Sequence, residues 1–450
     1  MPAARRSAVL ALVVAGALAA CGTGAPGHVR LGVLAPLTGP RAFLGHEVAN
    51  GAELAVAELN RRGGLLGEDV ELVVVDDASL VDLPGQLADL AEVHRVSAVI
   101  GPETAGVLTG PRSPLSRRDV PALLPTAFAG DLDEASTFVA RTVPSAAAQA
   151  ERLGSWLTDV RRADAVAVLV VDPVEGAAAG AALRQGFDRT DLDVAVVAEA
   201  DGEASQLGPA VAQLRRRAPD ADAVLLWGPP PATARATLAV RELGWDVQIA
   251  VPASSFVAEY RTLTGAASEG VVLAFPFRQE WFGARLTSWM LSYHAAHGIG
   301  ALPGLDTLVI DLPVAAAAAY DAVMVAADAV QRADSREPAA VARTLPEVET
   351  DGVLRVYDLA DREAYTAEDL YVARFAALAV VYDADPRLDA DAQRRFWQAQ
   401  VSAEFLPAEA LAGPAGALLR SLLEARRDDV PRYVPPLPPP GPVGHPGTDR

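Results

Sequence analysis

The stretch VRLGVLAPLTGPRAFLGHEVANGAELAVAELNRRGG, residues 29–64, decides the fold class. Its apolar start, residues 29–35, predicts a buried strand, and residues 36–45 contain the glycines and proline that are typical of a loop. Apolar residues then recur at helical spacing from Val48 to Leu59, ahead of two glycines that favour a helix end. A strand and helix in this order predict the first half of a βαβ unit.

Apolar strands and amphipathic helices keep alternating after this stretch. Continuous valine, leucine and isoleucine strands separated by helices indicate parallel sheets covered on both faces, so the predicted fold class is α/β. The alternation restarts near residue 145, which gives two units of about 120 residues, each the size of a domain. The predicted strands are residues 70–75, 98–101, 122–124, 165–171, 194–198, 223–227 and 248–251.

Later elements are too few for a third domain. They comprise predicted strands at residues 271–275, 352–357 and 370–382 and an alanine-rich helix at 314–332. We therefore expect them to complete the first two sheets.

Charge and composition exclude several functions. The 450 residues include 58 acidic side chains against 38 of lysine or arginine, all of them arginine, for a net charge of −20. A nucleic-acid partner is not expected, because binding phosphates requires a cationic surface. Without lysine the chain cannot form a phosphate-binding loop of the Gly-Lys-Ser/Thr type, a Schiff base or a Ser-Lys dyad.

The N-terminus has the pattern of a secretion signal. Arg5 and Arg6 precede an apolar run at residues 8–20, which is short for a membrane span. The run ends in Leu-Ala-Ala-Cys-Gly, which resembles the lipobox of bacterial lipoproteins and contains the only cysteine, Cys21. We expect residues 1–20 to be a lipoprotein signal peptide and residues 21–28 a tether acylated at Cys21. The alternative is an ordinary secretion signal with an incidental cysteine.

Short motifs along the chain resemble branched-chain amino-acid substrate-binding proteins of ABC importers, over about residues 29–382. They include Leu-Ala-Pro-Leu-Thr-Gly-Pro at 34–40, Gly-Ala-Glu-Leu-Ala at 51–55, Gly-Pro at 101–102, Arg-Thr-Val-Pro-Ser at 141–145 and Ala-Tyr-Asp-Ala at 319–322. The resemblance implies a type 1 periplasmic-binding-protein fold, with two Rossmann-like lobes and parallel sheets joined by three crossings. We expect these crossings near Pro144, Gly270 and Gly352.

The same resemblance sets the expected domain boundaries. Lobe 1 would comprise residues 29–144 plus 271–351, and lobe 2 residues 145–270 plus 352–383. We expect a helical extension at 384–428. Residues 429–450 are rich in proline, which favours a solvated, disordered tail.

Ligands of such folds lie where strand C-termini and helix N-termini converge. The resemblance implies that the loop after Gly101 and the loop after β-forming residues 122–124 hold a ligand carboxylate. Thr104 offers a hydroxyl there, although it is equally suited to cap a helix, and Ala105 stands where the family has a serine. Ala127 can still donate its backbone N–H, whereas Phe128 replaces a threonine.

The second lobe also departs from the family pattern. Glu175 replaces a tyrosine that covers the ligand, and Ala253 replaces the acidic residue that holds its ammonium group. Because these anchors are missing, a free branched-chain amino acid is a disfavoured ligand. Glu175 could equally be a solvated helix-start carboxylate, and Trp227 a core residue. The expected ligand-binding residues are Phe43, Thr104, Ala105, Thr126, Ala127, Phe128, Glu175, Trp227, Ala253 and Tyr320.

Enzyme motifs are missing from the sequence. There is no Gly-x-Ser-x-Gly elbow and no Gly-x-Gly-x-x-Gly after the first strand, and His294 and His297 lack an acidic partner motif for zinc. Asp76 and Asp77 form the best acidic pair, which a capped turn explains more simply. We therefore expect no enzymatic activity, cofactor or metal.

Two functional hypotheses remain. The first is an extracytoplasmic, lipid-anchored, monomeric solute-binding protein that captures an amino-acid-like or amide-like ligand by lobe closure. Its partners would be the permease and ATPase of an ABC importer. The alternative is a lipid-anchored sensor or scaffold that has lost transport.

Overall fold

The apolar run at residue 29 forms β1 (Val29–Ala35), which lies between β2 (Val70–Asp76) and β3 (Ala98–Ile100). β4 (Ala122–Leu124) and β5 (Val139–Arg141) extend the sheet in the order β2-β1-β3-β4-β5, and every pairing is parallel. The computed structural model describes residues 28–39, 41–77, 82–103, 108, 114–126, 132, 139–172, 176–200, 202, 204–276, 284–297, 313–360, 362–375 and 380–382.

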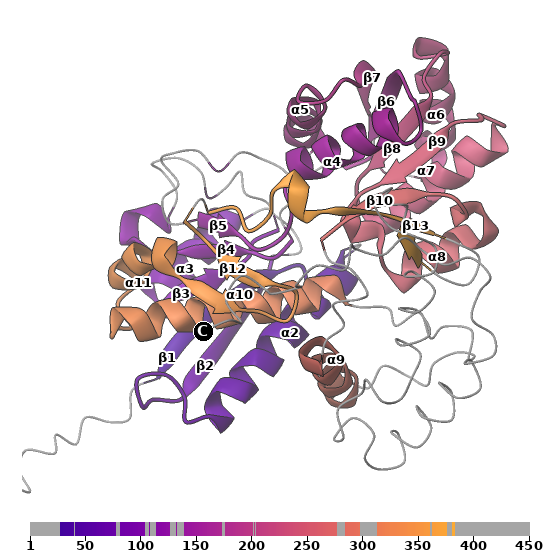
Figure 1. Cartoon of the computed structure of the whole chain (residues 1–450). Coiled ribbons are helices and arrows are strands. Elements are labelled where there is room, and N and C mark those ends of the chain that lie inside the picture. The colour runs from indigo at the N-terminus through magenta and orange to yellow at the C-terminus, as the bar shows by residue number, and fades with distance from the viewer. Residues whose placement is uncertain are drawn as a thin grey trace, which may run out of the picture.

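A second sheet has the strand order β14-β13-β10-β9-β8-β6-β7. Figure 1 shows that its strands β6 to β10 lie in a separate lobe from the first sheet. Its parallel strands are β6 (Ala165–Val170), β7 (Asp193–Glu199), β8 (Ala223–Trp227), β9 (Gln248–Val251) and β10 (Val272–Phe275). β13 (Tyr371–Phe375) and β14 (Val380–Tyr382) pair antiparallel at one edge.

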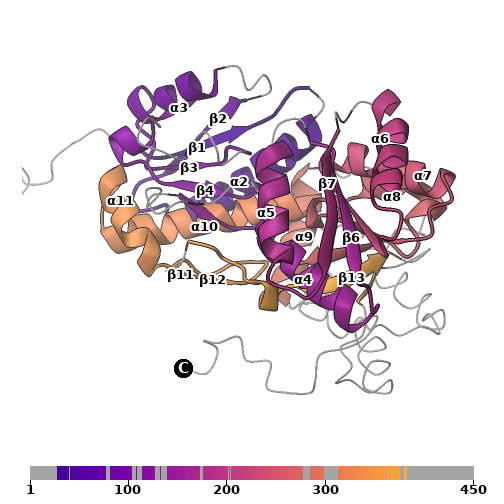
Figure 2. The ribbon, with the colours of Figure 1, turned by 90° about the horizontal axis from the view of Figure 1, so that it is seen from above.

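Helices cover both faces of each sheet, as the alternation predicts (Figure 2). The helices of the first lobe are α2 (Ala42–Arg61), α3 (Leu83–Glu92), α9 (Ala284–His297), α10 (Val314–Ala333) and α11 (Pro338–Thr344). The helices of the second lobe are α4 (Ala146–Asp159), α5 (Gly176–Phe187), α6 (Ala204–Arg217), α7 (Pro230–Glu242) and α8 (Ala258–Thr264).

The late strands correct the expected crossings. β10, β13 and β14 belong to the second sheet and β11 and β12 pair only with each other, so none of the late strands joins the first sheet. The chain therefore returns to the first lobe after Phe275 rather than near Gly270. Gly352 lies in the turn between β11 (Glu349–Asp351) and β12 (Val356–Asp358), a separate hairpin against α10. The last crossing thus comes between β12 and β13, and residues 352–358 belong with the first lobe.

Buried hydrogen bonds hold this hairpin on α10. The Asp321 carboxylate is fully buried and accepts hydrogen bonds from the backbone N–H groups of Val353, at 2.6 Å, and Leu354, at 2.9 Å. The Tyr357 hydroxyl donates a third, at 3.0 Å. Further along the crossing, Arg141 at the end of β5 forms an ion pair with Glu363. These contacts fix the path of the chain as it leaves the first lobe.

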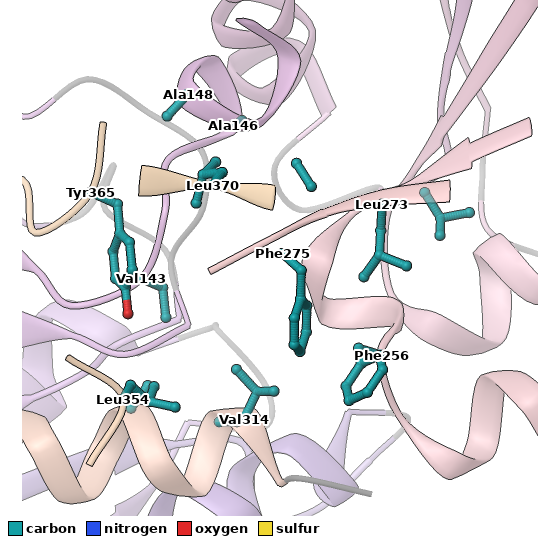
Figure 3. Close-up of a cluster of buried hydrophobic side chains, with 14 of the residues drawn as sticks. Val143, Ala146, Ala148, Phe256, Leu273, Phe275, Val314, Leu354, Tyr365 and Leu370 are labelled. Carbon is teal, nitrogen blue, oxygen red and sulfur yellow. The ribbon is translucent and has the colours of Figure 1, made fainter. Parts of the chain in front are cut away.

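One apolar cluster runs through both lobes at the crossings. Figure 3 shows Val314 and Leu354 of the first lobe on one side of it and Phe256 and Phe275 of the second on the other. The two aromatic rings lie 4.3 Å apart between centroids. Burying this apolar surface stabilises the junction between the lobes.

Helix α10 is a core helix of the first lobe. Its composition and length would allow it to cross a membrane, but 78% of its most apolar window is buried inside the protein. It packs closely on α2, where a Cβ atom added to Gly51 would lie 2.0 Å from the backbone oxygen of Ala316. Only glycine lets the two helix backbones approach this closely.

We predict that Gly51→Ala destabilises the protein by about 2 kcal/mol or more, because the added methyl group overlaps backbone that cannot move freely. Glu53→Ala introduces the same residue on the exposed side of α2 and should change stability by less than about 0.5 kcal/mol. Urea unfolding of both variants measures the difference. Equal effects would show that the contact between α2 and α10 is not close.

Candidate functional site

A pocket lined by residues of both lobes lies between them. First-lobe residues on its walls are Arg41, Phe43, Leu44, Glu47, Glu103, Pro125, Thr126, Val143, Val314 and Ala315. Second-lobe residues are Asp172, Trp227, Gly228, Pro229, Pro230, Ser254 and Val257. We call this the interlobe pocket.

The topology explains why these residues meet. Most of them follow a strand of one of the two sheets: β1, β3, β4 and β5 in the first lobe, and β6, β8 and β9 in the second. Parallel strands end at the same edge of a sheet, so their following loops gather there. The interlobe pocket is formed where two such edges face each other.

The most strongly buried charges of the interlobe pocket surround Arg41. Its Nη2 atom lies 2.5 Å from Oε1 of Glu103 and 3.7 Å from Oδ2 of Asp172. The two carboxylates are only 3% and 4% exposed, and they come from different lobes. Arg41 therefore forms an electrostatic contact across the pocket.

A glycine positions Glu103. Gly101 has a φ of +98°, and an added Cβ atom would lie 2.2 Å from the backbone oxygen of Leu34 in β1. A larger residue would be excluded there, so the chain leaves β3 close to β1 and brings Glu103 near Arg41.

Burial alters the protonation of two acidic groups here. Desolvation raises the pKa of Glu103 to about 7, helped by the charges of Asp77 and Asp172 and opposed by Arg41. Desolvation also raises the pKa of Asp77 to about 6, against the effect of Arg41. Asp77 is fully buried, and neither carboxylate oxygen has a hydrogen-bond partner among the described residues.

Asp76 and Asp77 have different roles, although they are adjacent. Asp76 accepts hydrogen bonds from the backbone N–H of Leu37, at 2.8 Å, and from the hydroxyl of Thr38, at 2.8 Å. Asp76 thus stabilises the loop after β1, so the capped turn expected for the pair is found for Asp76 only. Asp77 instead belongs to the buried charges around Arg41.

Three of the expected site residues line the interlobe pocket: Phe43, Thr126 and Trp227. Ala253 does not line it, but its backbone N–H donates to Oε1 of the buried Gln149 at 2.8 Å, which holds the loop whose next residue, Ser254, is in the wall. The remaining expected residues Cys21, Thr104, Ala105, Ala127, Phe128 and Glu175 lie outside the described residues.

Tyr320 is placed differently from the expectation. Its hydroxyl donates to Oε2 of Glu58 at 2.5 Å, and its ring meets that of Trp289 edge-on, with centroids 5.9 Å apart. It is not among the residues that line the interlobe pocket. Tyr320 therefore connects α10 to α2 and α9, because the side of the helix that carries it packs inside the lobe.

Arg41, Glu103 and Asp172 were not among the expected site residues. Only their position in the sequence indicates a role in the site, since each is a charged residue in a loop that follows a strand. That signal is weak, because most surface loops also carry charges.

The lining of the interlobe pocket is suited to binding a small molecule. The described residues contain no group of histidine, cysteine and acidic side chains placed to hold a metal ion. The interlobe pocket combines aromatic and apolar walls with a few converging polar groups, which is typical of a small-molecule site.

The raised pKa of Glu103 predicts a pH-dependent stability. The folded state keeps the proton to about pH 7 while the unfolded chain releases it near its ordinary value of 4.5, so stability falls as pH rises between these values. Glu103→Gln removes this loss. The free energy of unfolding of the variant, relative to that of wild type, should therefore be about 1–3 kcal/mol higher at about pH 8 than at about pH 5, since one pKa unit corresponds to about 1.4 kcal/mol.

Urea unfolding at both pH values measures this gain. Glu53→Gln, at an exposed position, serves as the control and should follow wild type. A Glu103→Gln curve parallel to that of wild type would contradict the raised pKa.

Comparison with known sequences gives a family match and shorter alignments. The profile described as "Periplasmic binding protein" matches residues 28–378. Leu/Ile/Val-binding protein BraC3 of Rhizobium johnstonii is 40% identical over 124 residues, which are 27% of this chain and 34% of the relative. Leu/Ile/Val-binding protein homolog 3 of Brucella melitensis is 38% identical over 104 residues, 23% and 28%. The alignment thus spans about a third of these curated relatives.

Solved structures match over most of the chain. LivJ from Streptococcus pneumoniae, in complex with isoleucine, has a TM-score of 0.64 at 20% identity and covers 79% of this chain and 100% of its own. A solute-binding protein of an ABC transporter from Rhodopseudomonas palustris, in complex with 3,4-dihydroxybenzoic acid, has a TM-score of 0.63 at 18% identity, covering 77% and 93%. At these identities the likeness is one of fold.

Proposed function

Because the chain belongs to the periplasmic binding protein family, we propose that it is the extracytoplasmic solute-binding component of an ABC importer. The observation that carries this proposal is the interlobe pocket, whose walls come from the strand ends of both lobes. The family and the type 1 fold expected from the sequence are both confirmed. Members of this family are solute-binding proteins, which agrees with a function in binding.

Lobe closure on the solute is part of the proposal. A ligand shifts two lobes toward a closed arrangement only if it binds that arrangement more tightly. Residues from both lobes line the interlobe pocket, so a small molecule in it gains contacts with the second lobe as the lobes approach. The contact between Arg41 and Asp172 supports this motion, because it already joins the two walls.

The fold leaves the identity of the solute open. The similar structures were solved with ligands as different as isoleucine and an aromatic acid. Which ligand this protein binds therefore depends on the residues of its own site. The replaced anchors at Ala105, Phe128 and Ala253 support a ligand other than a free branched-chain amino acid.

We predict that a ligand found by thermal-shift screening of amines, amides, amino acids and aromatic acids raises the melting temperature and reduces the radius of gyration. A ligand at about 100 times its Kd stabilises the protein by about 2.7 kcal/mol. Trp227→Leu should reduce both changes, because Trp227 lines the interlobe pocket.

Trp245→Leu is the matched control, since Trp245 is also buried in the second lobe but lies outside the residues of the interlobe pocket. Each variant is compared with its own ligand-free state by solution scattering. A tight ligand without compaction would overturn closure, and a complete lack of stabilising compounds would favour a sensor or scaffold.

We further propose that the protein is held at the outer face of the cytoplasmic membrane by acylation of Cys21. The lipobox-like sequence before this cysteine supports the anchor. Cys21→Ser should release most of the protein from the membrane fraction, whereas Thr23→Ala, which leaves the cysteine in place, should not. Detergent partitioning measures this. Equal membrane association of the two variants would rule out the lipid anchor.

A further inference from the structure

The charges on the walls of the interlobe pocket are unequal. Glu47, Glu103 and Asp172 line it, and Arg41 is the only basic residue among the described residues that do so. Asp77 is buried close enough to act electrostatically on Glu103. The described lining of the interlobe pocket is therefore acidic when these groups are ionised.

Among the residues that the structure describes, an anionic ligand has no uncompensated cation to meet there. The charge of Arg41 is already offset by Glu103, at 2.5 Å, and by Asp172, at 3.7 Å. Burying a further carboxylate beside these groups would be costly without another counter-charge.

The uncharged side chains of the interlobe pocket suit a cation. Phe43 and Trp227 both line it, and aromatic rings attract ammonium and guanidinium groups, tryptophan most strongly. Thr126 and Ser254 add hydroxyl groups that can accept hydrogen bonds from such donors. The net charge of −20 would also draw cations toward the protein.

We propose that the interlobe pocket binds a cationic solute without a free carboxylate, an amine or a guanidine, with its charge against Glu103 and Asp172. Phe43 and Trp227 contact the rest of the molecule. This proposal rests on the proposed function and specifies its ligand. Because Glu103 and Asp172 belong to different lobes, a cation between them favours the closed arrangement.

Binding of such a cation depends on pH. The charged groups that act on Glu103 are Arg41 before α2, Asp77 after β2 and Asp172 after β6. Burial and the two carboxylates keep the pKa of Glu103 at about 7, so part of the population is protonated below this pH. A bound cation stabilises the ionised form, and affinity should rise with pH up to about 7 and level off above it.

Matched pairs of probes test the charge preference in the full chain. Agmatine is arginine without its carboxylate, and leucinamide is leucine with the carboxylate made neutral. By calorimetry, we expect agmatine at about pH 8, or leucinamide at about pH 7 where its amine is still mostly charged, to bind at least about tenfold more tightly than its carboxylate counterpart. The affinity should be several-fold lower at about pH 5.5.

Two variants test the assigned carboxylates. Asp172→Asn and Glu103→Gln should each weaken binding of the better cation about tenfold or more, and Glu103→Gln should also flatten the pH dependence. Glu53→Gln, an exposed change of the same chemistry on α2, should leave binding unchanged. The pH series on the unaltered protein needs no variant and stays decisive if either substitution prevents folding.

The outcomes separate this proposal from the function on which it rests. Tight, compacting binding of leucine or 3,4-dihydroxybenzoate, with no binding of agmatine or leucinamide, overturns the cationic ligand but leaves solute binding intact. No binding of either cationic probe at about 1 mM also overturns the cationic ligand. If the broad screen of amines, amides, amino acids and aromatic acids finds nothing either, solute binding fails with it.

Discussion

The close contact between α2 and α10 at Gly51 is the constraint on which the first lobe depends. The two helices are far apart in the sequence, and the chain has passed through the second lobe before α10 begins. Their backbones meet where Gly51 lies against Ala316, which allows the small residues of α10 to pack in the core. The same contact places Val314 and Ala315, at the start of α10, near Phe43 and Leu44, at the start of α2. The packing of two helices thus builds one wall of the interlobe pocket.

The interlobe pocket holds a cluster of buried charges around Arg41. This side chain is 20% exposed, whereas the carboxylates of Glu103 and Asp172 are almost completely buried. Among the described residues, one cation beside several buried carboxylates only partly offsets the cost of their desolvation, which is why the pKa of Glu103 and that of Asp77 remain raised. The site can therefore stabilise a further positive charge. The same charged groups connect the two lobes.

The scaffold of this protein identifies its family, whereas its ligand depends on the residues of the site. The family match extends over residues 28–378, and similar structures cover nearly all of their own length. The motifs behind that match form strands, turns and helix contacts, such as Asp76 holding the loop after β1 and Asp321 holding the β11–β12 hairpin. The sequence departs from the family pattern at Ala105, Phe128, Glu175 and Ala253, which the resemblance assigns to the ligand site. A shared fold is therefore compatible with a different solute.

The sequence by itself determined the α/β class, the two units, and most strands and helices, because these follow from local periodicity. The helix predicted at 314–332, for example, is found at Val314–Ala333. Tertiary structure decided which sheet β10 joins, since a short, wholly apolar strand carries no mark of its partner. It also decided that Tyr320 faces Glu58 and that Arg41 lies between Glu103 and Asp172. Contacts between distant loops, and the desolvation that shifts their pKa values, exist only once the sheets are assembled, so no local pattern of residues can encode them.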